Sequence, residues 1–181
     1  MEPGTLNAPI MWTLRPVTAA DDAFLLRVYA DTRADELALT TWDDAQRESF
    51  LRMQHQAQAA HYRAHWHNAE HAVIEATIDS RRHDVGRLWL HQRPGAIHIL
   101  DIAVLGEWRG RGIGTLCLRR LMDQAEASAR EVTIYVEAGN PARLFYDRLG
   151  FLPVGEPDGV HQRMAWRRVP TKTMEVCDEQ A

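Results

Sequence analysis

The chain has 181 residues, of which 45% are hydrophobic and 25% charged, and its formal net charge is −4. These values are typical of a globular domain with a hydrophobic core. They exclude a chain that is disordered throughout, because disordered chains combine low hydrophobicity with high net charge. No apolar run approaches the ~20 residues that a membrane-spanning helix needs, and the mild acidity provides no basic face for nucleic acid. We therefore expect neither a membrane nor a nucleic acid as partner.

The first residues of the chain and its cysteines lead us to expect a cytoplasmic location. The first ten residues, MEPGTLNAPI, lack the basic start and the apolar stretch of a signal peptide. The two cysteines, Cys117 and Cys177, lie far apart, which argues against a disulfide framework and a structural zinc site. We expect one domain over residues 12–170, with tails at 1–11 and 171–181, the second of them poorly ordered.

The first third of the chain is predicted to form a strand and two helices. The strand covers residues 12–17, and Thr18 and Asp21 then have the spacing of a capping box that begins a helix ending near Arg33. Asp43 and Asp44 begin the second helix, because carboxylates complement the positive end of the helix dipole. This helix reaches about residue 65, and its apolar residues recur at helical spacing: Phe50, Met53, Ala57, Ala60 and Ala64.

The remaining elements alternate between strands and helices. Strands are predicted at 71–78, 85–92, 96–105, 132–137, 151–154 and 159–168, with a polar turn at 79–84. A helix is predicted at 112–129, and Asn140-Pro141 begins another that Gly150 ends. This order predicts an α/β three-layer sandwich in which helices flank a central sheet.

The most informative segment, IAVLGEWRGRGIGT, covers residues 102–115. A buried strand ends there, a glycine-rich turn follows, and a helix begins. Three glycines at alternate positions let the backbone approach a ligand closely, and the amides of the turn and helix start attract negative charge. Arg109 and Arg111 add positive charge. The segment therefore predicts a phosphate or pyrophosphate ligand.

Three other interpretations of this turn are weaker. A Walker A loop needs Lys followed by Ser or Thr after its last glycine, whereas Thr115 and Leu116 follow Gly114. A dinucleotide fingerprint needs the spacing G-x-G-x-x-G in the first strand–helix unit, whereas this chain has G-x-G-x-G in its middle. The third alternative is a tight turn with no ligand.

Two motifs in order resemble those of the GNAT superfamily of acetyl-CoA-dependent N-acetyltransferases. Arg109-x-x-Gly112-x-Gly114 is similar to the signature R/Q-x-x-G-x-G/A, and NPARLFYDRLGF at residues 140–151 is similar to the second signature. A helix and a strand separate them, as in the family, and the resemblance covers residues 12 to about 168. It implies a mixed sheet with a splayed central strand flanked by helices, acetyl-CoA as cosubstrate and no metal.

The resemblance also implies roles for particular residues. The turn that would hold the coenzyme A pyrophosphate consists of Arg109, Gly110, Arg111, Gly112, Ile113, Gly114 and Thr115. Backbone groups of Ile102 and Val104 would pair with the acetyl carbonyl and the pantetheine arm. Asn140 would contact the pantetheine end, although a role as helix cap fits the sequence equally well. Tyr146 resembles the general acid that protonates the departing thiolate.

The general base is less well defined by the sequence. An alkyl amine has a pKa of about 10, so its proton must be accepted directly or through water. Asp101 is the favoured base, since the superfamily commonly has an acidic residue there, and a structural role is its alternative. His98 and Glu137 are further candidates. Strand alternation places Asp101 with Ile99 and Ala103 on one face of the sheet, and His98 with Leu100 and Ile102 on the other.

We therefore expect an N-acetyltransferase that transfers the acetyl group to a primary amine by direct attack, with a small amine favoured over a protein amine. The alternative is a non-catalytic acyl-CoA-binding or interaction module. The connection between the first two helices carries Asp31, Asp35, Glu36, Asp43 and Asp44 against Arg33. These acids favour a cationic acceptor, and Gln54, Gln58 and Tyr62 could add polar contacts along the same wall.

Two further expectations concern metals and assembly. His61 and His65 lie four residues apart but lack the glutamate of H-E-x-x-H, so we interpret them as part of a solvated helix face. The superfamily resemblance is compatible with a homodimer, and no residue specifies its interface.

Overall fold

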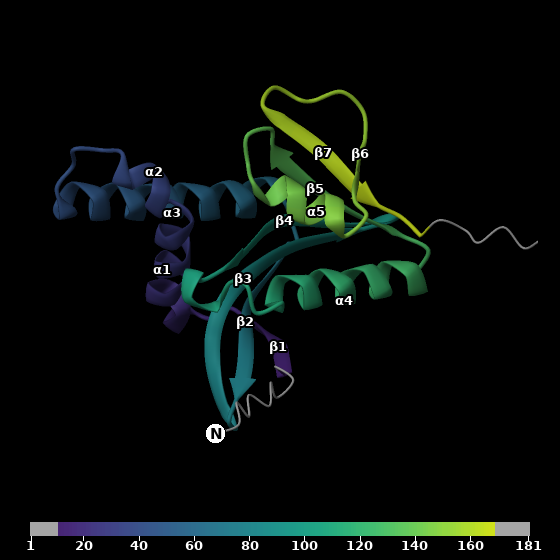
Figure 1. Cartoon of the computed structure of the whole chain (residues 1–181), viewed down its shortest axis with the longest axis horizontal. Helices are drawn as coiled ribbons and strands as arrows, with labels where there is room; N and C mark the ends of the chain where they lie inside the picture. Colours follow the sequence, from purple (N-terminus) through teal and green to yellow (C-terminus); the bar gives the residue numbers. More distant parts are fainter. Residues whose placement is uncertain (1–10, 169–181) are drawn as a thin grey trace, which may run out of the picture.

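The computed structural model describes residues 11–168, and a seven-stranded sheet forms its centre (Figure 1). The strands lie in the order β1-β2-β3-β4-β5-β7-β6, and every neighbouring pair is antiparallel except β4 and β5. The strands are β1 (Met11–Pro16), β2 (Glu70–Ile78), β3 (Arg81–Arg93), β4 (Ala96–Val104), β5 (Glu131–Glu137), β6 (Leu152–Pro153) and β7 (His161–Trp166). The predicted mixed sheet is thus confirmed.

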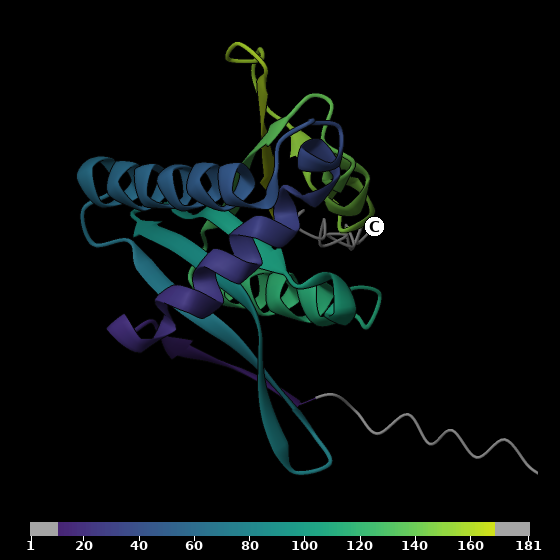
Figure 2. The same cartoon turned by 90° about the vertical axis from the view of Figure 1, so that its left-hand side faces the viewer.

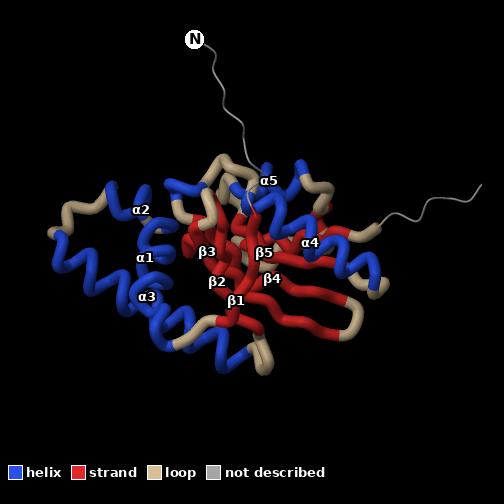
Figure 3. The backbone as a smooth tube through the Cα atoms, turned by 90° about the horizontal axis from the view of Figure 1, so that it is seen from below, coloured by secondary structure: helices blue, strands red, loops and turns tan. Residues whose placement is uncertain are grey.

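Helices cover both faces of this sheet and complete three layers. They are the short helix η1 (Ala19–Asp21), α1 (Asp22–Thr32), α2 (Ala34–Ala38), α3 (Asp44–His65), the short helix η2 (Gly106–Trp108), α4 (Ile113–Ala127) and α5 (Ala142–Arg148). Seen from below, α1, α2 and α3 form one group, and α4 and α5 lie on the other side of the strands (Figure 3). No helix within residues 11–168 is long and apolar enough to span a membrane.

The two predicted helix starts in the first third are confirmed by their caps. The amide of Thr18 donates to Oδ2 of Asp21 over 2.7 Å. At α3, the amide of Gln46 donates to Oδ1 of Asp43 over 2.8 Å, and the amide of Asp43 donates to Oε1 of Gln46 over 3.0 Å. The short α2 between them was not predicted, because a single helical turn shows no measurable periodicity.

The predicted turn at 79–84 is too long. The chain reverses at Asp79 and Ser80, which have φ values of 48° and 62°, and β3 already begins at Arg81. The polar residues that follow pair with the end of β2, where Arg81 lies opposite Ile78 and Asp84 opposite Glu75. They are polar because this end of the hairpin lies outside the core, not because it is a loop.

Helix α3 is oriented differently from most amphipathic helices. Its apolar stripe points away from the protein, with Met53 56% exposed and Ala57, Ala60 and Ala64 also exposed. None of its residues is buried. An amphipathic helix usually turns such a stripe to the core, so the apolar periodicity predicted the helix but not the side on which it packs.

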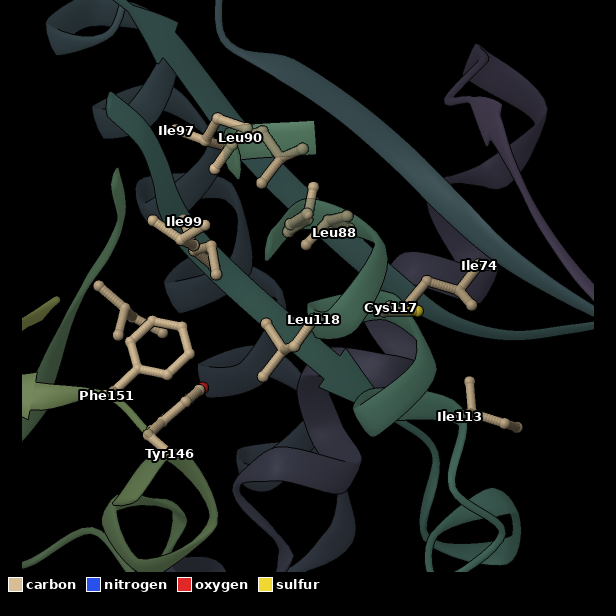
Figure 4. Packing of buried hydrophobic residues seen from close by; sticks show 14 of the residues in the cluster. Ile74, Leu88, Leu90, Ile97, Ile99, Ile113, Cys117, Leu118, Tyr146 and Phe151 are labelled. Carbon is tan, nitrogen blue, oxygen red and sulfur yellow. The ribbon is translucent and has the colours of Figure 1, made fainter. Parts of the chain in front are cut away.

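The main core lies between the sheet and α4. Leu88, Leu90, Ile97 and Ile99 of the sheet pack with Leu118 and other residues of α4 (Figure 4). Cys117 also belongs to this core, as expected, and burial raises the pKa of its thiol to about 12. Cys177 and most of the two predicted tails lie outside the described residues.

Strand β4 separates from β5 halfway along its length. The two strands pair from Ala96 to Ile99 only, whereas β5 continues beside β7 to Glu137. At the same point the register with β3 shifts, because Leu90 lies opposite Ile99 and Trp89 opposite Asp101. Leu100 is therefore an extra residue, a β-bulge, and bulges bend a strand. The predicted splay of the central strand is present.

The bulge changes which side chains share a face. Ile99 and Ile102 both pack against the core beside α4. Asp101 and Ala103 face α1 and α3 instead, since Asp101 contacts Arg87 there and Ala103 packs with Val28. The expectation that Asp101 lies beside Ile99, and His98 beside Ile102, is therefore wrong, because strict alternation does not continue through a bulge.

Candidate active site

The glycine-rich turn borders a cavity of about 600 Å³ between β4, α4 and α5. The cavity is lined by Ile102, Val104, Trp108, Arg109, Gly110, Gly112, Ile113, Gly114, Thr115, Ala142, Phe145, Tyr146 and Arg148. Nearly every residue of the predicted coenzyme A turn is among them, together with Tyr146 and both predicted backbone contacts of β4. The fold thus brings the two sequence motifs to one cavity.

The backbone of the turn forms a cradle of hydrogen-bond donors. Gly110 and Gly112 have φ values of 74° and 81°, which an L-residue rarely adopts. Within residues 11–168 no side chain caps α4, and its first internal bond is from the amide of Leu116 to the carbonyl of Gly112. The preceding helical amides therefore face outward at the positive end of the dipole, as a pyrophosphate requires.

The arginine side chains of the turn make contacts that the sequence did not reveal. Nε of Arg109 donates to the carbonyl of Val104 over 2.9 Å, and its guanidinium pairs with Asp31 of α1. Asp31 also accepts the amide of Gly106 over 3.0 Å. Arg111 lies over the ring of Trp108, 4.7 Å from its centroid. Both side chains thus fix the turn to its surroundings, and backbone amides remain as its donors.

The backbone of β4 beyond the bulge points into the gap between the strands. The amide of Leu105 donates to the carbonyl of Val85 over 2.9 Å, so odd-numbered residues bond to β3 at this end of β4. In an antiparallel pair the backbone groups of alternate residues point in opposite directions. The groups of Ile102 and Val104 therefore point away from β3, toward the side where β5 no longer pairs.

Tyr146 lines the cavity and is 5% exposed. Its ring packs edge-on against Phe151, with 5.7 Å between the ring centroids (Figure 4). Burial, and to a smaller extent the charge of Asp101, raise the pKa of Tyr146 well above its usual value of 10.0. Its hydroxyl is therefore protonated at neutral pH and can act as a donor.

Asp101 lies on the opposite face of the sheet in a buried ion pair. Nε of Arg87 donates to Oδ2 of Asp101 over 2.7 Å, and Nη2 donates to Oε1 of Gln58 over 3.0 Å. The side chain of Arg87 is 2% exposed and that of Asp101 19%. Sequence reasoning missed Arg87, although a lone arginine inside the apolar run of residues 85–90 was a signal that it needed a partner.

His98 also faces α3, next to the point where the strands separate. Its Nδ1 lies 2.9 Å from Oγ1 of Thr133, and its ring packs between Trp66 and Tyr135. Burial is the largest cause that lowers the pKa of His98, to about 4. The imidazole is therefore neutral at pH 7, which is the form that accepts a proton.

Comparison with known proteins identifies this combination of features. The model of the acetyltransferase (GNAT) family matches residues 34–151, which is more than half of the sequence. The chain belongs to this GNAT family. It is therefore an acyltransferase of a family that uses acetyl-CoA.

Solved structures share the fold of this GNAT domain at low sequence identity. The PaiA N-acetyltransferase from Thermoplasma acidophilum in complex with coenzyme A is 18% identical with a TM-score of 0.61, over 87% of this chain and 99% of that one. An acetyltransferase from Thermus thermophilus is 17% identical with a TM-score of 0.60, over 87% and 97%. Spermidine N-acetyltransferase from Vibrio cholerae in complex with coenzyme A and spermine is 16% identical with a TM-score of 0.57, over 86% and 95%. A search of curated proteins finds no match.

Several other predicted residues of the GNAT domain have local structural roles. Oδ1 of Asn140 accepts the amide of Ala142 over 2.9 Å, so this side chain caps α5, and it does not line the cavity. Glu36 pairs with Arg33 over 2.9 Å. Together with Asp31 and the cap Asp43, most of the acidic cluster is thus already occupied. In the described part of the chain, Asp35 and Asp44 form no ion pair.

The histidines of α3 and its polar residue Tyr62 also make defined contacts within the protein. His61 and His65 stack on each other with 4.1 Å between centroids, on an exposed face. Within residues 11–168, no three His, Cys, Asp or Glu side chains converge as metal ligands. The hydroxyl of Tyr62 donates to the carbonyl of the bulge residue Leu100 over 3.1 Å, and burial raises the pKa of Tyr62 to about 12.

Proposed function

We propose that this GNAT domain transfers the acetyl group of acetyl-CoA to a primary amine by direct attack, with Tyr146 as general acid. The observation that carries this proposal is the cavity beside β4. It is bordered at one side by the uncapped glycine turn and at another by the hydroxyl-bearing Tyr146, and it is also lined by Ile102 and Val104, which lie beyond the last residue of β4 that pairs with β5.

The cavity fits the coenzyme part of acetyl-CoA, which supplies the acetyl group as a thioester. The residues that would hold the pyrophosphate are the turn from Arg109 to Thr115, with their amides as donors. Arg148 lines the same cavity and is the basic side chain in its wall that sequence reasoning did not name. Asn140 lies outside the cavity wall but binds the amide of the lining residue Ala142, and its side chain is proposed to contact the pantetheine end at the edge of the cavity.

Three groups of the chain would then move protons or stabilise charge. A backbone amide of Ile102 or Val104 donates to the oxygen on which negative charge develops. Tyr146 donates its proton to the departing sulfur. Asp101, oriented by Arg87, accepts the proton of the amine directly or through water. Holding both reactants in one gap supplies a large part of the rate, because the reaction becomes effectively unimolecular.

A small amine is the proposed acceptor, and a cationic one is favoured. Asp35 and Asp44 supply negative charge near the connection between α1 and α3. The Vibrio cholerae enzyme that shares the fold is a spermidine N-acetyltransferase seen with spermine, which is itself a polyamine. A cytoplasmic location is proposed from the scarcity of cysteines.

The transfer is tested by measuring free thiol released from acetyl-CoA with a panel of amines. We expect release that depends on the amine and follows saturation kinetics, with small cationic amines giving the highest kcat/KM. Coenzyme A binding by calorimetry without thiol release from any amine would favour the alternative, a non-catalytic acyl-CoA-binding module. Preference for amines that carry carboxylates would contradict the charge of the acceptor.

The charge argument has its own test in the double substitution Asp35→Asn with Glu36→Gln. We expect KM for a cationic acceptor to rise about twofold to threefold at low salt, since exposed charges act weakly, and the rise to shrink as salt screens them. The double substitution Glu156→Gln with Asp158→Asn, at exposed positions before β7, is the control and should leave KM unchanged.

A further inference from the structure

The outward face of α3 carries a regular apolar stripe. Phe50, Met53, Ala57, Ala60 and Ala64 follow one another at intervals of three, four, three and four residues. This is the spacing of the positions at which two helices of a coiled coil meet. We call these five residues the α3 stripe. Such a stripe on a helix indicates that another helix packs along it.

The described part of the chain does not cover the α3 stripe. Met53 is 56% exposed, and the three alanines are exposed. At the beginning of the helix, Trp42 packs edge-on against Phe50 with 5.0 Å between centroids and extends the apolar surface. Trp42, Phe50 and Met53 also border a hollow of about 520 Å³. In Figure 2, α3 lies across the molecule with no other described element in front of it.

The opposite side of α3 attaches to the protein through polar and aromatic contacts, among them the ring of Tyr62, which lies 5.4 Å from that of Trp89. Gln58 accepts a hydrogen bond from Arg87, and Tyr62 donates one to Leu100. The ring of His55 lies 5.6 Å from that of Tyr29 in α1. The helix thus attaches through polar and aromatic side chains and turns its apolar stripe outward. That arrangement is favourable only when the apolar side is covered as well.

We propose that the α3 stripe binds a second copy of the chain, with the two α3 helices antiparallel about a two-fold axis. The stripe is bulky in its first half and small in its second. An antiparallel pairing centred near residue 55 places Phe50 opposite Ala60 of the partner subunit, and Met53 opposite Ala57 of the partner subunit. Every large side chain then meets a small one, which a parallel pairing would not achieve, and a two-fold axis repeats each contact.

The charges of α3 favour the same arrangement. Its first turn carries Asp44 after the cap Asp43, and its last turn carries Arg63 and His65. In the antiparallel pair the acidic beginning of each helix lies beside the basic end of the other, and the helix dipoles also oppose. A parallel pair would place acid beside acid. Charge and side-chain size therefore select the same orientation.

Sedimentation of the full-length protein tests the proposal. We expect the wild type to sediment as a dimer at about 100 μM, a concentration well above a micromolar dissociation constant. Met53→Glu and Ala57→Glu should each raise the dissociation constant by about 100-fold or more, because a carboxylate would be buried against apolar groups. Ala127→Glu, at an exposed position of α4, is the matched control and should remain dimeric.

Cross-linking tests the orientation in a Cys177→Ser background, where the buried Cys117 is protected. Met53→Cys protein mixed with Ala57→Cys protein should form an intermolecular disulfide, whereas Met53→Cys mixed with Ala127→Cys should not. Far-UV circular dichroism and coenzyme A binding confirm that each variant is folded. The proposal is overturned by a monomeric wild type, by a dimer that survives both glutamate substitutions, or by failure of the first pair to cross-link.

Discussion

At the splay of β4, the two faces of the sheet expose different kinds of chemical group. The face toward α4 and α5 surrounds one cavity, whose wall consists mainly of the glycine turn and apolar side chains, with the polar side chains of Arg109, Thr115, Tyr146 and Arg148. The face toward α1 and α3 consists of polar side chains from α3, β3 and β4, with the Arg87–Asp101 pair at its centre. A coenzyme common to a whole family suits a backbone site, because backbone geometry depends little on side-chain identity. A variable acceptor suits a side-chain site.

The protonation states also differ between the faces. Burial raises the pKa of Tyr146 and keeps it a neutral donor, whereas burial lowers the pKa of His98 and keeps it a neutral acceptor. Under the proposed function, Tyr146 donates a proton on the face toward α4 and α5, and Asp101 accepts one on the face toward α1 and α3.

The largest expected effect is that of Tyr146→Phe, which removes only the proposed donor. We expect kcat to fall by ~10²–10⁴-fold, the usual worth of general acid catalysis, while the affinity for acetyl-CoA changes little. Steady-state kinetics with a thiol readout measure both. Tyr135→Phe, at an exposed tyrosine of β5, is the control. An unchanged kcat, once chemistry is shown to limit the rate, would falsify the role of Tyr146.

A smaller loss is expected from Gly114→Val, which acts on binding instead of chemistry. A Cβ atom at Gly114 would lie 3.5 Å from Cζ of Phe145, so the larger valine side chain narrows the cavity. We expect the Kd for coenzyme A to rise about 10- to 100-fold in calorimetry. Gly139→Val, where a Cβ atom would meet nothing within 4 Å, is the control. Gly112 is a poorer probe, because its φ of 81° makes any side chain strained.

Asp101→Asn distinguishes a base from a purely structural carboxylate. If Asp101 accepts the amine proton, the rising limb of the pH–rate profile shifts and kcat/KM falls. Removal of its charge also leaves Arg87 buried without a counter-ion, which we expect to cost about 2–3 kcal/mol in urea unfolding, less than for a fully buried pair because Asp101 is 19% exposed. A profile of unchanged shape and height together with that loss of stability would assign Asp101 a structural role.

The smallest expected effect is that of His98→Gln on the free energy of unfolding at acidic pH. The pKa of His98 in the folded protein, about 4, lies below its usual value of 6.5, so the unfolded chain binds more protons between these values. The free energy of unfolding therefore falls as the pH drops below about 6.5, by on the order of 2 kcal/mol by pH 4. His98→Gln should flatten this fall in urea titrations at several pH values. A slope equal to that of the wild type would contradict the depressed pKa.

Local signals in the sequence predicted most of the elements. The cap at Asp43, the left-handed Gly150 and the glycine turn each act within a few residues, so they are visible in a single sequence. The Leu100 bulge is different, because alternating and bulged strands have the same apolar composition. Its presence depends on pairing with β3, and the faces of Asp101 and His98 could not be assigned without it.

The sequence also did not reveal which tertiary contacts its acidic residues make. Asp31 was interpreted as part of an acidic surface, but it holds Gly106 and Arg109, which lie about 75 positions further along the chain. The sequence shows which residues are acidic. It does not show which residues the fold places next to them. The α3 stripe shows the same limit, since periodicity reveals an apolar side without revealing what covers it.

The extra residue in β4 makes the gap between β4 and β5 depend on the length of the strand. Leu100 and Asp101 together lie opposite one residue of β3. If Leu100 is left out, the side chains before and after it alternate between the two faces as they do in a regular strand. Deletion of Leu100 would leave each remaining side chain of β4 on its present face and allow the strand to run straight beside β5. We expect the gap between β4 and β5 to close then, although no proposed catalytic group had been changed. The separation of the two strands thus depends on how many residues β4 contains, independently of what those residues are.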